Sequence, residues 1–445
     1  MPGGLRRELR ELFRLALPLA AAQAGTQLMG LVDVAVLGRA GAAELAGAGM
    51  ANAIYFAVSI FGMGMVLGID PLIAQAVGAG NHERARHVLW QGVWLALFVS
   101  AALMVILFAA TAAIPLIGAQ QEIVGHARAF LVVRTFSLAP FLLFFVFRSY
   151  LQAHRVTRPM LIAVIVANIL NFTLDVAFVF GFGPIPAMGT AGAALATVIC
   201  TIVEVIIVAR AARRMDPSER VDHRPERAAI VQAARIGLPS GLHLGAEVGI
   251  FALVALLAAR LGTLDLAAHQ LVIGLASFTF TIAVGVATAG SVRVGIFIGA
   301  RDAAGTRTAG WATFAGGVLV MGISALAFAI VPGPIARLVT NQENVIAASI
   351  PLMLVAAVFQ LSDGIQAVGA GVLRGAADTK YTFWANLAGH WMVGLPVALW
   401  LGFGRGMGVV GLWWGLCAGL TVVAVLLFVR FERRSRGVIA PVGTG

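Results

Sequence analysis

Several acidic side chains lie inside long apolar stretches of this chain, where a charge is costly. They are Asp33 and Asp175 in the first half of the sequence and Glu247 and Asp363 in the second. A charged side chain at the centre of a membrane helix costs roughly 2.5–3.5 kcal/mol on insertion scales. These acids are therefore candidates for binding or carrying a cation. The competing interpretation is that each one forms a hydrogen bond that only packs helices together.

The acids of the first half have oxygen-bearing neighbours at helical spacing. Asp33 shares a stripe with Thr26 and Gly30. Two later segments each gather such side chains on one face, namely Asn168, Asn171 and Asp175 on one, and Thr197, Thr201 and Glu204 on the other. Carboxylate, amide and hydroxyl oxygens suit a small hard cation such as Na⁺, and a carboxylate can also carry a proton. The first half can thus build an oxygen-lined cation site.

The second half offers different polar groups. Glu247 has His243 one helical turn before it. Asp363 shares a stripe with Gln360 and Gln366, and Phe359 lies one turn earlier. His390 is a further candidate for handling a proton, with a packed histidine as the plainer interpretation. The two halves are therefore expected to hold polar sites of unlike composition.

Composition indicates the solvent around these helices. Hydrophobic residues make up 60% of the 445 residues and charged residues only 11%, whereas soluble domains carry roughly 25% charged residues. Such a chain requires a lipid bilayer around it. The net charge of +11 is then a signal of membrane topology, and no nucleic-acid partner is expected.

Apolar stretches long enough to span a membrane predict an all-α integral membrane protein with twelve transmembrane helices. The predicted spans are 12–37, 46–74, 89–114, 123–151, 158–182, 188–210, 232–259, 265–297, 307–331, 343–372, 380–403 and 408–431. Most Lys and Arg residues fall in alternate loops, and only Arg39, Arg260, Arg337 and Arg405 fall in the others. The positive-inside rule then places both termini in the cytoplasm of a cell whose inner membrane holds the protein.

The two halves of the chain repeat each other at an offset of about 221 residues. Residues 14–18 (RLALP) match 235–239 (RIGLP), Gly64 matches Gly285, and Trp90 matches Trp311. The predicted organisation is an N-lobe of six helices (1–212), a cytoplasmic linker (213–227) and a C-lobe of six helices (228–445). An even number of spans per half makes these parallel bundles related by a pseudo-twofold axis along the membrane normal, an arrangement typical of transporters that bind substrate between their halves.

The candidate acids are not repeated between the halves. At the repeat offset Asp33 aligns with Val254, Glu247 with Thr26, and Asp363 with Phe141. The shared scaffold therefore does not require these acids, which favours a functional role for them. A phosphate-binding loop is also missing, since Gly62 and Gly64 lack the Lys-Ser/Thr continuation. We expect no ATP, no cofactor and no enzymatic activity, so the driving force would be an ion gradient.

Taken with these features, short motifs along nearly the whole chain resemble the multidrug and toxic compound extrusion (MATE) family. The motifs are LVD at 31–33, QAVGAG at 75–80, GLPS at 237–240, AAHQ at 267–270, and the stretch from Asp363 through GVLRG at 371–375 to Asp378 and Thr379. The resemblance implies export of organic cations, drugs or metabolites by rocking alternating access, in exchange for H⁺ or Na⁺. We expect the protein to act as a monomer, although the sequence does not determine its oligomeric state.

The resemblance also implies which residues act. The N-lobe cation site maps to Asp33, Asn171, Asp175 and Thr197, and its Asn171/Asp175 pair is similar to the DinF-type branch. A C-lobe cation or substrate site maps to Glu247 and Asp363, as in NorM-like members. Phe359 stands where NorM-like members can carry Tyr, so an aromatic contact with a cation would lack the hydroxyl. The choice between H⁺ and Na⁺ stays open.

Two other functions are compatible with parts of this pattern. A flippase for lipid-linked precursors, from the same broad superfamily, would need several cations in its cavity to bind a pyrophosphate. Here the spans carry acids, and the cations lie mostly in loops or near the cytoplasmic ends of spans, with Arg128 and Arg134 as the exceptions. A membrane enzyme would need clustered His or acidic ligands, and the sequence shows no such cluster. Export driven by an ion gradient is the function we expect.

Overall fold

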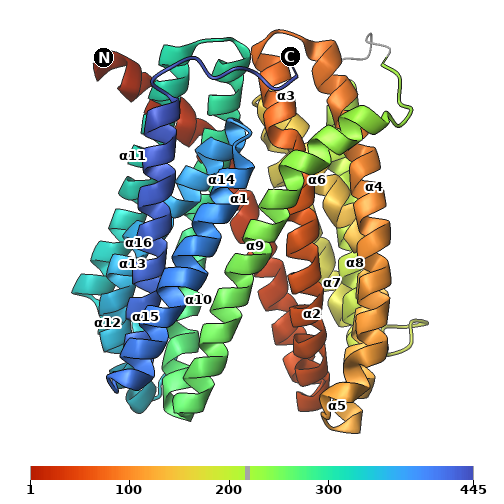
Figure 1. Cartoon of the computed structure of the whole chain (residues 1–445). Coiled ribbons are helices and arrows are strands. Elements are labelled where there is room, and N and C mark those ends of the chain that lie inside the picture. The colour runs from red at the N-terminus through yellow and green to blue at the C-terminus, as the bar shows by residue number, and fades with distance from the viewer. Residues whose placement is uncertain (1, 216–220, 444–445) are drawn as a thin grey trace. The chain divides into compact units, whose positions relative to one another are not determined.

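The computed structural model describes residues 2–215 and 221–443, and within them the chain is helical (Figure 1). Apart from one isolated bridge between Phe182 and Ile185, these residues contain no extended pairing. The predicted all-α fold is confirmed. The division of the chain into repeated halves, 1–212 and 228–445, stays a prediction. Residues 216–220 of the predicted linker lie outside the described residues.

The helices group into two compact units, each of which we describe by itself. The N-terminal unit comprises residues 21–77 and 81–241, and the C-terminal unit comprises the described parts of residues 1–20, 78–80 and 242–445. Two long helices, α1 (Pro2–Ala40) and α9 (Arg227–Leu261), are shared between the units. Each passes from one unit to the other just after an internal proline, Pro18 in α1 and Pro239 in α9.

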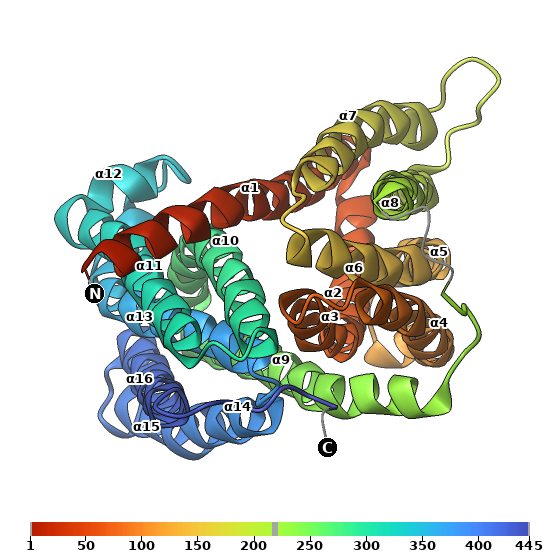
Figure 2. The same ribbon diagram turned by 90° about the horizontal axis from the view of Figure 1, so that it is seen from above.

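The remaining helices of the N-terminal unit follow in chain order. They are α2 (Ala42–Val66), α3 (Ile69–Gly78, whose last residue belongs to the other unit), α4 (His82–Ala113), the short 3₁₀ helix η1 (Ile114–Ile117), α5 (Gln121–Thr135), α6 (Leu138–Ala153), α7 (Arg158–Phe180) and α8 (Gly189–Arg214). Figure 2 shows α7 and α8 side by side at the edge of this unit.

The C-terminal unit holds the rest of the chain. Its helices are α10 (Thr263–Gly299), α11 (Ala303–Ile330), α12 (Pro332–Arg337), α13 (Glu343–Gly375), α14 (Thr379–Asn386), η2 (Leu387–Gly394), α15 (Leu395–Leu399), η3 (Trp400–Gly404) and α16 (Gly408–Arg434). Helices α10 and α13 approach closely at Gly371 and Gly375, where an added Cβ would collide with the backbone carbonyls of Ala287 and Ser291. Small residues one turn apart permit this close packing.

Membrane-spanning helices account for nearly all of this structure. Within the described residues, eleven helices are long and apolar enough to cross a bilayer, and a bent pair, α5 and α6, completes twelve. This confirms the twelve predicted spans, although the span predicted at 123–151 is two helices at 42° to each other. Pro140 explains the break, because its ring cannot donate to the carbonyl of Phe136 and clashes with it.

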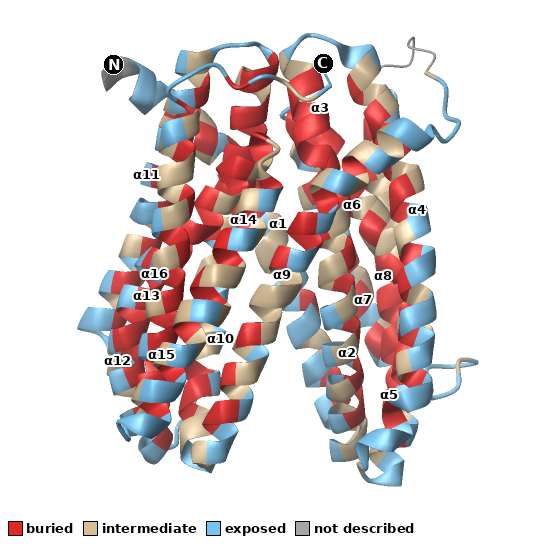
Figure 3. Ribbon diagram, viewed as in Figure 1, coloured by how far each residue is buried: buried red, intermediate tan, exposed pale blue. Residues whose placement is uncertain are grey.

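Large apolar side chains cover the outer faces of these helices. On α4, Phe98, Val105 and Ile106 are each more than half exposed, whereas Leu95, Leu103 and Leu107 on the other face are buried (Figure 3). In water this exposed apolar area would be strongly unfavourable, and in a bilayer it is in contact with lipid. The chain is a multi-pass membrane protein.

One span of the C-terminal unit departs from regular α-helix. Between Thr379 and Gly404 the helix contains two π-helical segments, η2 and η3. Pro396, just after η2, has no backbone N–H to donate to the preceding turn, which loosens the ladder there. π-Helical turns frequently occur at functional sites because they shift side chains out of helical register.

Candidate functional site

Three helices bring the predicted cation-site residues of the N-terminal unit together. A small apolar cluster of Met29, Ala167 and Cys200 joins α1, α7 and α8. Each polar residue follows or precedes a member of this cluster by about one turn on its own helix, since Asp33 lies four residues after Met29 and Asn171 four after Ala167. Packing of the apolar cluster therefore directs the polar side chains toward one another.

Asp33 is the centre of the hydrogen bonds at this site. The Asn171 side chain donates its Nδ2 hydrogen to Asp33 Oδ1 at 3.0 Å. The Thr197 hydroxyl lies 3.5 Å from Asp33 Oδ2 and shares its hydrogen with the Ala193 carbonyl at 3.1 Å. Asn171 and Thr197 are buried, while Asp33 is partly exposed. One carboxylate is thus held by an amide and a hydroxyl from two other helices.

Asp175 completes the site and has no donor of its own. Its side chain is fully buried beside Asp33 and Asn171. Neither carboxylate oxygen receives a hydrogen bond from the described residues, and the same holds for Asn171 Oδ1. Buried polar oxygens without a partner are costly, and two neighbouring carboxylates also repel each other. A proton or a small cation among these oxygens would relieve both costs.

Two more charged groups lie close to this site. Arg134, near the end of α5, and Glu204, on α8, both interact electrostatically with it or with each other. The Arg134 guanidinium stacks over the Tyr55 ring at 4.7 Å, and its Nε and Nη1 have no acceptor in the described part of the chain. The predicted site set did not include these two residues. The sequence features that could have indicated them are the position of Arg134 inside a predicted span and that of Glu204 on the same helix face as Thr197.

The C-terminal unit holds a second polar cluster, built by α9 and α13. Glu247 Oε2 lies 3.2 Å from His243 Nε2, one turn earlier on α9. From α13, Gln366 donates its Nε2 hydrogen to the same oxygen at 3.4 Å, and this Nε2 also lies 3.5 Å from His243 Nε2. All three side chains are largely buried. Glu247 is therefore oriented by a histidine and an amide.

Asp363 and His390 add two titratable groups to this cluster. Asp363 is buried on α13 within electrostatic reach of Glu247. His390, on the π-helical segment η2, interacts electrostatically with Glu247 and His243, and its ring lies 6.3 Å from that of Phe251. His390 is 1% exposed, and neither ring nitrogen has a hydrogen-bond partner among the described residues. The cluster can thus accept a proton or a cationic group.

Phe359 lies in an aromatic stack next to this cluster. The side chain is 1% exposed and packs edge-on against Phe251 at 6.2 Å and Trp413 at 5.3 Å. These aromatic rings belong to the apolar core of the C-terminal unit. Phe359 therefore forms the apolar wall behind Glu247 and Asp363, and its ring would reach a ligand only after a side-chain or helix movement.

The structure thus brings the predicted site residues together in two groups. Asp33, Asn171, Asp175 and Thr197 form one group in the N-terminal unit. Glu247 and Asp363 form the other in the C-terminal unit, with His243, Gln366 and His390 as members that the predicted site set left out. Within the described residues, no group of three or more His, Cys, Asp or Glu side chains has the arrangement of a metal-ligand set.

Comparison with known proteins identifies relatives of the whole chain. The family model MatE matches residues 18–177 and 239–400, one segment in each half of the chain. A probable multidrug resistance protein NorM from Pseudomonas putida is 32% identical over 446 residues, which cover 98% of this chain and 96% of that protein. A protein with the same description from Mesorhizobium japonicum is 34% identical over 449 residues, again covering 98% and 96%.

Solved structures show the same fold at lower sequence identity. The eukaryotic MATE transporter AtDTX14 superposes with a TM-score of 0.86 at 20% identity, over 97% of this chain and 98% of that one. A transporter of the MOP superfamily from Pyrococcus furiosus gives 0.87 at 20% identity, over 97% and 96%. With the family match and the relatives above 30% identity, the chain belongs to the MATE family, whose members are membrane transporters and not enzymes.

Proposed function

We propose that this protein is a secondary active antiporter that exports organic cations, drugs or metabolites in exchange for H⁺ or Na⁺. The observation that carries the proposal is the Asp33–Asp175 pair, in which each Asp33 oxygen has a donor within 3.5 Å and Asp175 is buried without a donor among the described residues. The names of the relatives, multidrug resistance proteins, support the class of substrate.

In the proposed cycle, the N-terminal site takes up the coupling ion. Asn171 Nδ2 and Thr197 Oγ1 hold Asp33 in place, and the unpartnered oxygens of Asp175 and Asn171 face the incoming proton or Na⁺. Loading with one proton or one Na⁺ removes one negative charge from the pair, which weakens its attraction for a cationic substrate. An ion can change the balance between outward-open and inward-open forms only if it binds one form more tightly than the other. Asp175 is buried in this structure. A form of the protein in which water reaches Asp175 would bind the ion less tightly, so the two forms would differ in ion affinity.

The C-terminal cluster has a different proposed role, which is contact with the substrate. Glu247 and Asp363 supply negative charge, and Phe251 and Phe359 supply an apolar wall next to them. This combination suits an amphipathic cation, since the charge and the apolar body of such a molecule need different partners. The substrate would then be a small molecule bound without a cofactor.

The remaining parts of the proposal concern the whole chain. We place the protein in the inner cell membrane with both termini in the cytoplasm, because Lys and Arg cluster in alternate loops. It works as a monomer, since each candidate site is complete within one chain. Rocking of the repeated lobes would expose the substrate to each side of the membrane in turn.

A single substitution tests this function. Asp33→Asn keeps the size of the side chain and removes the carboxylate, so efflux of cationic dyes from cells that express the protein should fall to background. Glu343→Gln is the matched control, because Glu343 is an exposed acid paired with Arg337 at the start of α13, and it should keep wild-type efflux. Membrane levels of both variants are measured by immunoblot. Wild-type efflux by Asp33→Asn at equal membrane level would refute the proposed role of the carboxylate.

A further inference from the structure

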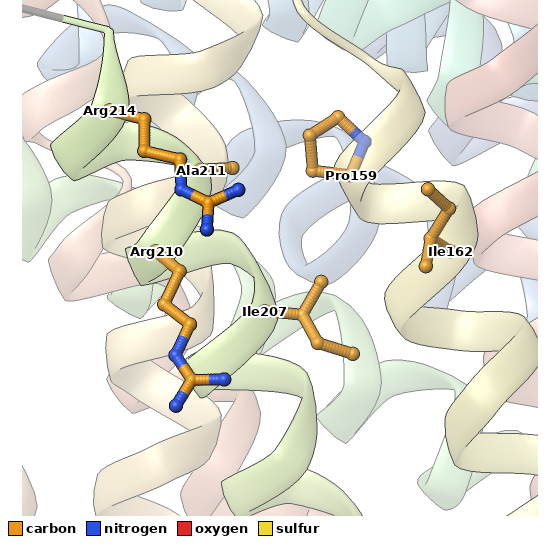
Figure 4. A pocket seen from close by; sticks show the side chains of 6 residues that line it. All are labelled: Pro159, Ile162, Ile207, Arg210, Ala211 and Arg214. Carbon is orange, nitrogen blue, oxygen red and sulfur yellow. The ribbon is translucent and has the colours of Figure 1, made fainter.

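A pocket lies on the N-terminal unit between the start of α7 and the end of α8, several turns along α7 from Asp175 and several turns along α8 from Thr197. Its volume is about 310 Å³, and it is lined by Pro159, Ile162, Ile207, Arg210, Ala211 and Arg214 (Figure 4). Both helices are membrane-spanning, from Arg158 to Phe180 and from Gly189 to Arg214. The pocket therefore sits where these two spans leave the bilayer.

Two arginines form the polar side of this pocket. Arg210 and Arg214 are one turn apart on α8, both are exposed, and Figure 4 shows their guanidinium groups on the same side of the helix. Neither forms an ion pair with a carboxylate among the described residues, unlike Arg307 with Glu432 or Arg430 with Asp378. Like charges at this spacing repel each other by a few tenths of a kcal/mol. An anion bound between the two guanidinium groups would be attracted to both and would offset their mutual repulsion.

The opposite side of the pocket is apolar. Pro159, Ile162 and Ile207 line it, and Ile162 is 53% exposed. Favourable interactions of the two cations with the C-terminal end of the helix dipole would explain their place in the last turns of α8. The apolar wall directly beside the cations is exposed to lipid, as the outer face of α4 is. A ligand that satisfies both sides must carry an anionic head on an apolar body.

We propose that this pocket binds an anionic membrane phospholipid. Arg210 and Arg214 bind its phosphate through charge-assisted hydrogen bonds, for which the planar guanidinium is well suited. The upper part of an acyl chain lies along Ile162 and Ile207. Basic pockets between membrane helices at the bilayer surface bind anionic lipid headgroups for the same electrostatic reason. A free phosphate would use the arginines and leave the apolar wall unsatisfied, so lipid is the occupant we assign.

Native mass spectrometry of the full-length protein in detergent tests this assignment. The probes are phosphatidylglycerol and phosphatidylcholine of equal chain length. Wild-type protein should retain phosphatidylglycerol in preference to phosphatidylcholine. The double variant Arg210→Gln/Arg214→Gln should bind phosphatidylglycerol about thirtyfold more weakly, because each cation near an anionic lipid surface contributes a factor of about five.

Arg213 supplies a matched control in the same turn of α8. Its guanidinium lies over the Trp90 ring at 5.7 Å and does not line the pocket, so Arg213→Gln removes one charge and should keep the lipid. Arg210→Lys/Arg214→Lys keeps both charges and should retain most of the binding, which separates lost recognition from misfolding. Equal lipid binding by the Gln double variant, equal loss in Arg213→Gln, no preference over phosphatidylcholine, or displacement of the lipid by millimolar inorganic phosphate would each overturn the assignment.

Discussion

At the residue scale, Asn171 is unusual because its single amide group lies beside two acids, Asp33 and Asp175. Its Nδ2 donates to Asp33, which leaves its Oδ1 without a partner and close to the buried Asp175. Asn168 also has an Oδ1 without a partner in the described part of the chain, but its Nδ2 donates to backbone carbonyls, of Gly25 on α1 and Val164 on its own helix, and not to an acid.

The two asparagines therefore predict different consequences of truncation. Asn171→Ala removes a hydrogen bond to a charged carboxylate, a bond typically worth about 1.5–3 kcal/mol. Ion-driven transport should slow by roughly tenfold or more, with a changed dependence on ion concentration. Asn168→Ala should lower thermal stability by about 1 kcal/mol and leave the ion dependence as in wild type. Both are measured by dye transport at varied ion concentration and by thermal unfolding in detergent. Identical ion dependence in the two variants would contradict the assignment.

Much of the N-terminal site could be predicted from the sequence, for a simple physical reason. Asn171 and Asp175 lie on one helix at a spacing that fixes their shared face, and an acid inside an apolar run is costly enough to signal function. The C-terminal cluster could be predicted only in part. His243 and His390 are more than one hundred residues apart in the sequence, so their proximity depends on the fold. His390 also lies in a π-helical segment, whose effect on side-chain direction cannot be read from the apolar pattern.

At the scale of elements, close packing on α10 positions α13, the helix that carries Asp363 and Gln366. Gly371 and Gly375 on α13 face the carbonyls of Ala287 and Ser291 on α10, and Gln366 and Asp363 lie one to three turns earlier on α13. Apolar length predicted these spans within a few residues. It did not predict the break at residues 136–137 or the π-helical segments, because these are local changes in backbone hydrogen bonding that leave the length of the apolar stretch unchanged.

A β-branched side chain at this contact should disrupt the C-terminal unit. Gly371→Val would push the two helices apart and should destabilise the protein by about 1–3 kcal/mol or more, as overpacking does. Gly274→Val on α10 is the control, since a Cβ there meets no atom within 4 Å. Thermal unfolding in detergent measures both. If Gly371→Val were as stable as Gly274→Val, the close contact between α10 and α13 at Gly371 would not be present in the protein.

At the scale of the whole molecule, each half of the chain contains a segment that matches the family model, but the candidate acids differ between the halves. The family match covers one segment in each half, 18–177 and 239–400. The acids nevertheless differ between the units, with Asp33 and Asp175 in one and Glu247 and Asp363 in the other. The sequence predicts a repetition of six helices, but it does not predict the division of α1 and α9 between the units, because that division depends on contacts between distant segments. We propose that the two sites have separate tasks, with the ion in one and the substrate in the other.

Purified protein in liposomes tests the central claim, which is exchange of a cationic substrate against an ion at Asp33 and Asp175. H⁺ and Na⁺ gradients are imposed one at a time while movement of a cationic dye is recorded, with Asp33→Asn and Asp175→Asn beside wild type. We predict that one of the two gradients drives dye in the opposite direction through wild-type protein and that both variants abolish this movement. Dye movement at the wild-type rate in either variant, or equally fast movement without any gradient, would contradict the account.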